Sequence, residues 1–347
     1  MRRATAQDVA DLAGVSRSSV SLVLNGHGEG NIAPAKQRLI LDAAERLNYR
    51  PNAVALSLRS QRTRTIGVLT WPSAAGTSSL ILSAALRTAT EAGYLLIFMD
   101  TGGDEEVESR ALTTLRDRQV EALLVIAPEL TDYRPPETML SVPTILVNCA
   151  DPQAGVTSVV PDEAGAGACA AQILVDAGHT RIGVIAGPAE SVQTRLRVAG
   201  CRQVITTELA APVQFVGGRD VASAAVAART VLTQAEPPTA LICAHERLAV
   251  GAALAAAQLQ LDIHRDLSLV SLDDGEQLAS QLNPAITTIE RPDRAMAEQA
   301  VTMLLDRLTR EAEFSVKQLA FVCPPAHRDS VVGPRLDVQP EEAASRR

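Results

Sequence analysis

The side chains best suited to chemistry near the start of the chain lie in the stretch SRSSVSLVLN, residues 16–25. Its apolar residues recur at a helical spacing, which leaves Arg17, Ser18, Ser21 and Leu22 on the outer side of a short helix that Ser16 can cap. An arginine can donate two hydrogen bonds to a guanine edge, and a slim polar helix fits the major groove of DNA. The stretch therefore predicts a surface that reads base edges.

Two further short helices are predicted around this one. Thr5 and Asp8 form the T-x-x-D pattern of a helix start, and Pro34 is suited to the first turn of another helix. The inner side of the first helix is predicted to carry Val9, Leu12 and Ala13. Three helices around one small core make a helix-turn-helix unit. The alternative is a helical hairpin that caps another domain.

The segment NYRPNAVALSLRS, residues 48–60, follows these helices. Its proline ends the preceding helix and introduces a short amphipathic run rich in alanine and leucine. A run of about eight residues is too short to form a stable helix alone. It would therefore need a partner helix or a DNA surface to become ordered.

Composition limits the class of protein. The 347 residues are 46% apolar and 21% charged, enough for more than one globular domain. No run approaches the roughly 20 apolar residues of a membrane helix, and the first residues lack the apolar core of a secretion signal. We therefore expect a cytoplasmic protein without a membrane partner. The five cysteines have no C-x-x-C spacing, so we predict neither disulfides nor a metal site.

Charge is divided unevenly along the chain. The formal net charge is -8, yet residues 1–64 carry ten Lys and Arg against five Asp and Glu, and the remainder carries 22 against 35. A basic head on an acidic body is typical of a nucleic-acid-binding module fused to a domain that must not adhere to DNA. On charge alone, a solvated basic face is an alternative.

From Ile66 onward, short apolar runs alternate with helix-length segments, and these runs include IGVLT, YLLIFMD, ALLVIAP, PTILVN, RIGVIAG and ALICAH. Runs that are buried on both faces and separated by helices predict doubly wound parallel sheets. TIGV at 65–68 and RIGV at 181–184 mark the first strands of two similar halves. We therefore predict two α/β lobes with a ligand cleft beyond the carboxyl ends of their strands.

The chain resembles the LacI/GalR family of bacterial transcription repressors in DVADLAGVSRSSVSLVLN, LNYRPN, AVALSLRS and GHTRIGVIAGP. The resemblance implies a homodimer that reads a roughly palindromic double-stranded DNA operator, with a leucine of each hinge wedged into the minor groove. Leu22 departs from the family, in which many members carry arginine, and Ala33 stands where a serine or threonine usually caps the third helix. The implied DNA contacts are Thr5, Ser16, Arg17, Ser18, Ser19, Ser21, Leu22, Asn25, Asn52, Ala55, Leu58 and Arg59.

The fold that follows is a small all-α helix-turn-helix head joined by a hinge to an α/β body of two doubly wound parallel-sheet lobes, like a periplasmic binding protein. In the family the lobes exchange segments, so that ligand binding can change the lobe arrangement and the separation of the two hinges. The predicted boundaries are 1–48 for the head, 49–64 for the hinge, 65–335 for the body and 336–347 for a disordered tail. Lobe one takes 65–160 and 291–318, and lobe two takes 161–290 and 319–335.

The effector is predicted to be a sugar or another small polar metabolite bound between the lobes. Arg197 and Asp273 match the arginine and aspartate that relatives direct at a ligand, and together they can bridge neighbouring polar groups. Each could instead belong to an ordinary salt bridge. His245-Glu246 replaces the Asn-Asp that relatives commonly carry, and a lone tryptophan could stack on a ring or pack on its own lobe. The candidate effector residues are Trp71, Asn148, Arg197, His245 and Asp273.

Two rival functions fit the sequence less well. GAGACA, residues 165–170, mimics a phosphate-binding loop of an enzyme, but no strand leads into its glycines, which more simply allow a helix to pack closely. A transport-type solute-binding protein would share the body but would have no use for the head. We therefore predict a DNA-binding transcriptional regulator and repressor that is not an enzyme and needs no cofactor.

Overall fold

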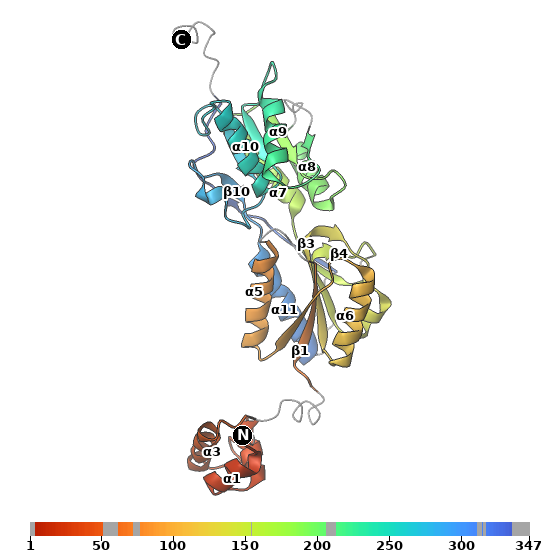
Figure 1. The fold of residues 1–347 in the computed structure, drawn as a ribbon, viewed down its shortest axis with the longest axis vertical. Helices are drawn as coiled ribbons and strands as arrows, with labels where there is room; N and C mark the ends of the chain where they lie inside the picture. The colour runs from red at the N-terminus through yellow and green to blue at the C-terminus, as the bar shows by residue number, and fades with distance from the viewer. Residues whose placement is uncertain are drawn as a thin grey trace. The chain divides into compact units, whose positions relative to one another are not determined.

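The structure is a computed structural model that describes residues 4–50, 62–71, 77–153, 155–205, 213–310, 314 and 317–334. The chain forms two compact units, Met1–Arg64 and Thr65–Arg347, called here the head and the body (Figure 1).

The head is a three-helix unit with its own small core. Its helices are α1 (Ala6–Ala13), α2 (Arg17–Leu24) and α3 (Pro34–Arg46). Val9, Val20 and Ile40, one from each helix, are almost fully buried against one another. Leu12 is 48% exposed, so its predicted inward position is wrong. An eight-residue helix packed against two neighbours buries only a narrow stripe, and Leu12 falls outside it. The predicted helix-turn-helix is confirmed.

The starts of the helices follow the local chemistry of the sequence. Thr5 Oγ1 accepts a hydrogen bond from the Asp8 amide at 3.3 Å, and the Asp8 carboxylate accepts one from the Thr5 amide at 2.7 Å. Ser16 Oγ caps α2 by accepting the amide N–H of Ser19 at 3.2 Å. As predicted, Ala33 provides no side-chain cap for α3.

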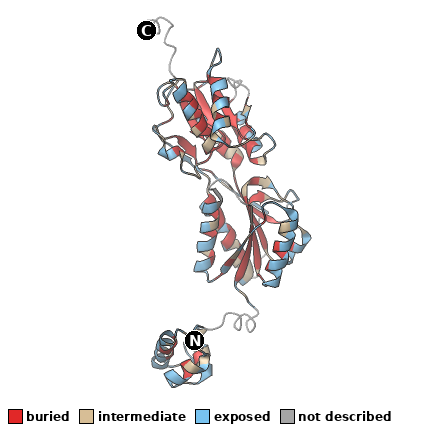
Figure 2. Cartoon of the chain, in the orientation of Figure 1, coloured by how far each residue is buried: buried red, intermediate tan, exposed pale blue. Residues whose placement is uncertain are grey.

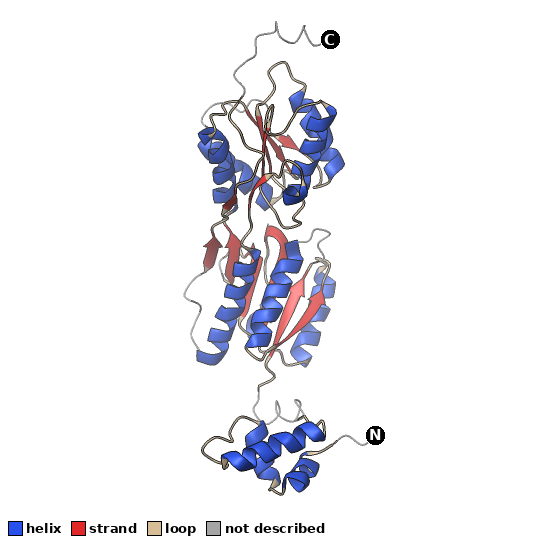
Figure 3. Cartoon of the chain, turned by 90° about the vertical axis from the view of Figure 1, so that its left-hand side faces the viewer, coloured by secondary structure: helices blue, strands red, loops and turns tan. Residues whose placement is uncertain are grey.

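Lobe one of the body contains a six-stranded sheet in the order β11-β5-β4-β3-β1-β2. Helices lie on both faces of this sheet (Figure 3). Its elements are β1 (Thr65–Thr70), α5 (Thr77–Glu91), β2 (Leu95–Asp100), α6 (Glu105–Asp117), β3 (Ala122–Asp132), η1 (Glu137–Ser141), β4 (Thr144–Ala150), β5 (Thr157–Pro161), α11 (Asp293–Arg310) and β11 (Gln318–Phe321).

Lobe two contains a second six-stranded sheet in the order β12-β10-β9-β8-β6-β7. Every strand pairing recorded in the two sheets is parallel except that of β10 with β12. Its elements are α7 (Glu163–Asp176), β6 (Ile182–Ala186), α8 (Val192–Val204), β7 (Gln214–Phe215), α9 (Val221–Leu232), β8 (Ala240–Cys243), α10 (Glu246–Gln258), β9 (Ser268–Ser271), η2 (Ala279–Gln281), β10 (Thr287–Ile289) and β12 (Pro325–Ala326).

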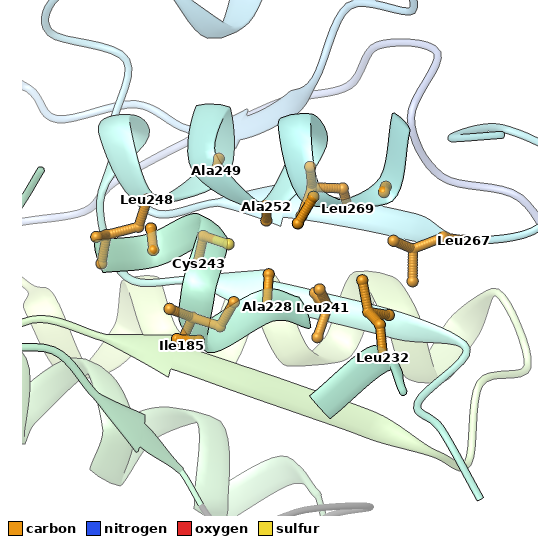
Figure 4. Close-up of a cluster of buried hydrophobic side chains, with 14 of the residues drawn as sticks. Ile185, Ala228, Leu232, Leu241, Cys243, Leu248, Ala249, Ala252, Leu267 and Leu269 are labelled. Carbon is orange, nitrogen blue, oxygen red and sulfur yellow. The ribbon is translucent and has the colours of Figure 1, made fainter. Parts of the chain in front are cut away.

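The central strands are buried on both faces, as their unbroken apolar runs predict (Figure 2). All five residues of β6 are buried, and its side chains alternate between two cores. Ile185 packs with Leu241 and Leu248 on the side of α9 and α10 (Figure 4), whereas Val184 packs with residues of α7 and α8. The two doubly wound lobes predicted from the sequence are confirmed.

Three segments cross between the lobes. They follow β5, β10 and β11, so lobe one is completed by α11 and β11 from the carboxyl-terminal part of the chain. The Asp162 amide donates to the Phe321 carbonyl at 2.8 Å, and the Glu290 amide donates to the Pro324 carbonyl at 2.8 Å, which ties the crossings together. The last crossing begins after Phe321 rather than after residue 318.

Helices α7 and α8 approach each other unusually closely. A Cβ atom built on Gly200 would lie 1.9 Å from the Ala164 carbonyl oxygen, and one built on Gly167 would lie 2.0 Å from the Arg197 carbonyl oxygen. GAGACA is therefore part of helix α7, and its glycines permit close packing, as expected. The expectation that no strand leads into them is wrong, because β5 ends at Pro161, directly before the Asp162 cap of α7. The close approach of Gly167 to α8 is what argues against a phosphate loop.

Candidate functional site

The outer face of α2 carries the predicted base-reading side chains. Arg17 and Ser18 are exposed in its first turn, and Leu22 is 37% exposed one turn later. Asn25 at the end of the helix donates through Nδ2 to Ser21 Oγ at 3.1 Å. The helix-turn-helix packing therefore leaves a polar face that includes one exposed leucine, Leu22.

Hydroxyl groups gather at the amino-terminal end of α2. Ser16 Oγ lies 2.8 Å from Ser18 Oγ and 2.9 Å from Ser19 Oγ. The positive end of a helix dipole and a group of hydroxyls both favour phosphate oxygens. Thr5 is exposed at the start of α1. The four candidates in the hinge lie outside the described residues: Asn52, Ala55, Leu58 and Arg59.

In lobe two, His245 and Asp273 meet at the carboxyl ends of β8 and β9. His245 Nε2 lies 3.5 Å from Asp273 Oδ2, and both side chains are buried. His245 Nδ1 accepts the Arg247 amide at 3.3 Å, so the neutral ring carries its proton on Nε2. Burial lowers the pKa of His245 to about 3. Burial alone would raise the pKa of Asp273, but the proximity of His245, Arg291 and Arg197 holds it below its ordinary value.

Glu246, the other departure from the family pattern, holds the loop that follows Asp273 through hydrogen bonds. Its buried carboxylate accepts the amides of Glu276 at 2.9 Å and Ala279 at 2.7 Å. Burial raises the pKa of Glu246 to about 7. The side chain therefore anchors the loop that follows Asp273.

Arg197 lies beside this pair and is 1% exposed. Its Nε donates to Glu163 Oε2 at 2.5 Å, and its Nη1 donates to the carbonyls of Ala244 and Leu272. Gln193 Nε2 donates to the other Glu163 oxygen at 2.5 Å. Arg197 is thus fixed to α7 and to the ends of two strands, and Glu163 is the buried partner that sequence reasoning missed.

A second buried ion pair lies at the crossing that follows β10. Arg291 Nη2 pairs with Asp293 Oδ1 at 3.1 Å, whereas Arg291 Nε and Asp293 Oδ2 have no hydrogen-bond partner within the described part of the chain. Burial raises the pKa of Asp293 to about 6, although Arg291 opposes that rise. Sequence reasoning missed both residues. A signal was present in ERPDR, where charged residues interrupt the passage from an apolar strand to a helix.

The remaining two candidates lie in lobe one. Asn148, in β4, has a left-handed φ of 59°, donates through Nδ2 to the Ala127 carbonyl at 3.0 Å, and leaves its buried Oδ1 without a partner in the described structure. Trp71, directly after β1, forms an edge-to-face contact with Tyr133, their ring centroids 5.4 Å apart. The structure thus brings Arg197, His245 and Asp273 together and packs Trp71 within its own lobe.

The chemistry of this site is hydrogen bonding and charge pairing. Among the described residues, no three or more His, Cys, Asp and Glu side chains are grouped to hold a metal ion. All five cysteines are free, and burial raises the pKa of each. Within the ranges described, no helix is long and apolar enough to cross a membrane.

The depressed pKa of His245 predicts a pH dependence of stability. The neutral ring is favoured in the folded body, so its contribution is lost as the pH falls below about 6.5, the unfolded value, towards about 3. Between pH 7 and pH 5 this loss amounts to about 2 kcal/mol. Urea unfolding at both pH values should therefore show a smaller acid sensitivity in His245→Asn, in which an asparagine can retain the helix cap. Equal sensitivity in the two proteins would reject the assignment.

Known protein families and individual relatives match both the head and the body of this chain. Residues 5–52 match the model for bacterial regulatory proteins of the lacI family, and residues 171–331 match a periplasmic binding protein-like domain. The ribose operon repressor of Escherichia coli K12 is 34% identical over 321 residues, which cover 88% of this chain and 94% of that protein. The chain belongs to the LacI family. The PurR repressor of Klebsiella pneumoniae strain 342 is 32% identical over 323 residues, covering 90% and 92% of the two chains.

Solved structures agree with this assignment to the LacI family. The Lac repressor dimer bound to operator and the anti-inducer ONPF aligns with a TM-score of 0.79 and 25% identity over 96% of this chain and 100% of that one. The transcriptional regulator CelR in complex with cellobiose aligns with a TM-score of 0.66 and 25% identity over 95% and 100%. This LacI-family chain is accordingly a ligand-responsive, DNA-binding transcription regulator. A transport-type solute-binding protein would leave residues 5–52 unexplained.

Proposed function

We propose that the chain is a homodimeric repressor that acts in the cytoplasm, reads a palindromic operator through α2, and responds to a small polar effector held between its lobes. The observation that carries this proposal is the exposed polar face of α2 on a capped helix-turn-helix head. In this proposal the body binds an effector and has no catalytic role.

On the DNA side, Arg17 and Ser18 would contact base edges, and the hydroxyls around Ser16 would hold phosphates. The hinge candidates Leu58 and Arg59 would act in the minor groove. Leu22 would offer only an apolar contact, for which the methyl group of thymine is the suitable partner. The operator should therefore differ from those of relatives with an arginine at this position.

On the effector side, three buried groups have unused hydrogen-bonding capacity. Asn148 Oδ1 can accept, Arg291 Nε can donate, and Asp293 Oδ2 can accept. A hydroxyl group both donates and accepts, so adjacent hydroxyls of a polyol or sugar suit this mixture. The names of two relatives, a ribose operon repressor and a regulator in complex with cellobiose, point in the same direction. Arg197, His245 and Asp273 would complete the site in lobe two.

An apolar edge of lobe one supports dimerisation. The edge strand β2 leaves Leu95 61% exposed and Phe98 39% exposed, and α5 leaves Leu80 and Leu86 exposed by 39% and 45%. Exposed apolar groups on an edge strand are a liability unless another chain covers them. A second copy would cover them and would bring two heads to the two half-sites of a palindrome.

Replacing Arg17 with alanine tests the DNA-binding role. Loss of one bidentate base contact should cost about 1 to 3 kcal/mol of specific binding and leave affinity for a scrambled duplex nearly unchanged. Fluorescence anisotropy with labelled operator and scrambled duplexes measures both quantities. Arg38→Ala is the matched control, because Arg38 is also exposed in the head but lies on α3. Equal losses from both variants, or equal losses on both duplexes, would contradict the proposed role.

A further inference from the structure

The carboxyl-terminal end of β3 reaches beyond its own lobe. The pairing of β3 with β4 shifts register between Ile126 and Thr131, and the irregular stretch between them contains Glu129. The end of β3 contacts α8 of lobe two. A bulge of this kind redirects side chains away from the regular pleat. Here it presents an acidic side chain to the other lobe.

Arg219 of lobe two receives this carboxylate. It lies in the loop between β7 and α9 and forms an ion pair with Glu129, and its side chain is 25% exposed. Its Nη2 also donates to Gln193 Oε1 at 3.1 Å. Among the described residues, this is the one ion pair that joins the two lobes outside the crossing segments.

The pair continues into the buried network of lobe two. The amide of Gln193 is used at both ends, because Oε1 accepts from Arg219 and Nε2 donates to Glu163. Glu163 in turn holds Arg197, which donates to the carbonyls at the ends of β8 and β9. A continuous series of polar contacts therefore links lobe one to the strand ends that carry the effector candidates.

We propose that Glu129 and Arg219 form an interlobe latch, which holds the body closed and passes its state through Gln193 and Glu163 to Arg197. This deepens the proposed function, on which it rests, by naming an element that both the effector and the lobe arrangement can bias. A partly buried pair at a lobe boundary needs to make only a modest contribution to the free-energy difference between two lobe arrangements, because that difference sets the ratio of their populations.

Charge exchange tests the latch in the full-length dimer. We expect Glu129→Arg and Arg219→Glu each to increase the rate of hydrogen exchange in peptides covering 127–133 and 214–221 by roughly fivefold. Each variant should also change the operator affinity by a similar factor, and the two variants should change it in the same direction as each other. The double variant, in which the charges are exchanged, should return both measurements to within about twofold of the original protein. Glu106→Arg is the matched control, because Glu106 pairs with Arg110 on the exposed face of α6 in lobe one.

Additive effects in the double variant would overturn the latch, and so would single variants indistinguishable from Glu106→Arg. Thermal unfolding identifies any variant that has lost its fold, and Glu129→Gln and Arg219→Gln then replace it. Exchange is measured without DNA. Restored exchange in a protein that never binds an operator would therefore contradict the proposed function and leave the latch supported.

Discussion

Gly200→Ala should destabilise the body by about 2 to 3 kcal/mol, even though alanine favours a helix by about 1 kcal/mol over glycine. The added Cβ would lie 1.9 Å from the Ala164 carbonyl oxygen, which is backbone and cannot rotate away. Helices α7 and α8 would have to separate. Urea unfolding of the two proteins measures the difference in the free energy of unfolding.

The control for this substitution is Gly217→Ala, because a Cβ at Gly217 would meet no atom within 4 Å. It should change stability by less than about 0.5 kcal/mol. Gly167→Ala should behave like Gly200→Ala, since its Cβ would meet the Arg197 carbonyl oxygen at 2.0 Å. If Gly200→Ala left the free energy of unfolding unchanged, α7 and α8 would not be in this close contact. The position of Arg197 on α8 beside Glu163 of α7 would then be in error.

Arg197→Ala should destabilise the body by about 3 to 5 kcal/mol and abolish the effector response. The substitution leaves the Glu163 carboxylate fully buried without its cation, and it leaves the carbonyls of Ala244 and Leu272 without their donor. Thermal and urea unfolding measure the stability. The change in operator affinity on adding a low-molecular-mass extract of the host cells, assayed at a temperature at which the variant is folded, measures the response.

A double-mutant cycle separates the pair from its surroundings. Glu163→Leu alone should be strongly destabilising because it strands the guanidinium of Arg197 in the core. The double variant Glu163→Leu with Arg197→Leu should be less destabilised than the sum of the two single variants, since no charge is then left unpaired. Strict additivity would show that the two side chains do not act as a pair.

Local features of this protein could be predicted from the sequence because their causes are local. Thr5 with Asp8, and Ser16, mark the helix starts of the head through bonds spanning three residues. The unbroken run IGVIA, one of several apolar runs separated by helical segments, predicted a strand buried on both faces. The close helix packing of the glycines of GAGACA was predicted correctly, although β5 does lead up to them and ends at Pro161. Membership of the LacI family followed from motifs that combine these signals.

The polar groups at the lobe crossings were only partly predictable from the sequence, because the fold brings them together through three crossing segments. Glu163 lies far in the sequence from the neighbouring Arg291 and Asp293, and the three residues meet where the chain passes between the lobes. Neither hydrophobic periodicity nor the spacing of motifs in the sequence predicts a contact between residues that the crossing segments bring together. The roles of Arg197, Asp273, His245, Asn148 and Trp71 stay predictions, and for Trp71 the contact with Tyr133 favours packing within its own lobe.

We expect this protein to read a specific operator under the control of a small polar metabolite. The most direct test is to select bound duplexes from fragmented host DNA at about 150 mM salt, where nonspecific attraction is largely screened, with and without a low-molecular-mass extract of the same cells. We predict enrichment of one short palindrome, lost in Arg17→Ala and altered by the extract. If neither condition enriched a palindrome, the result would contradict specific operator binding by this protein.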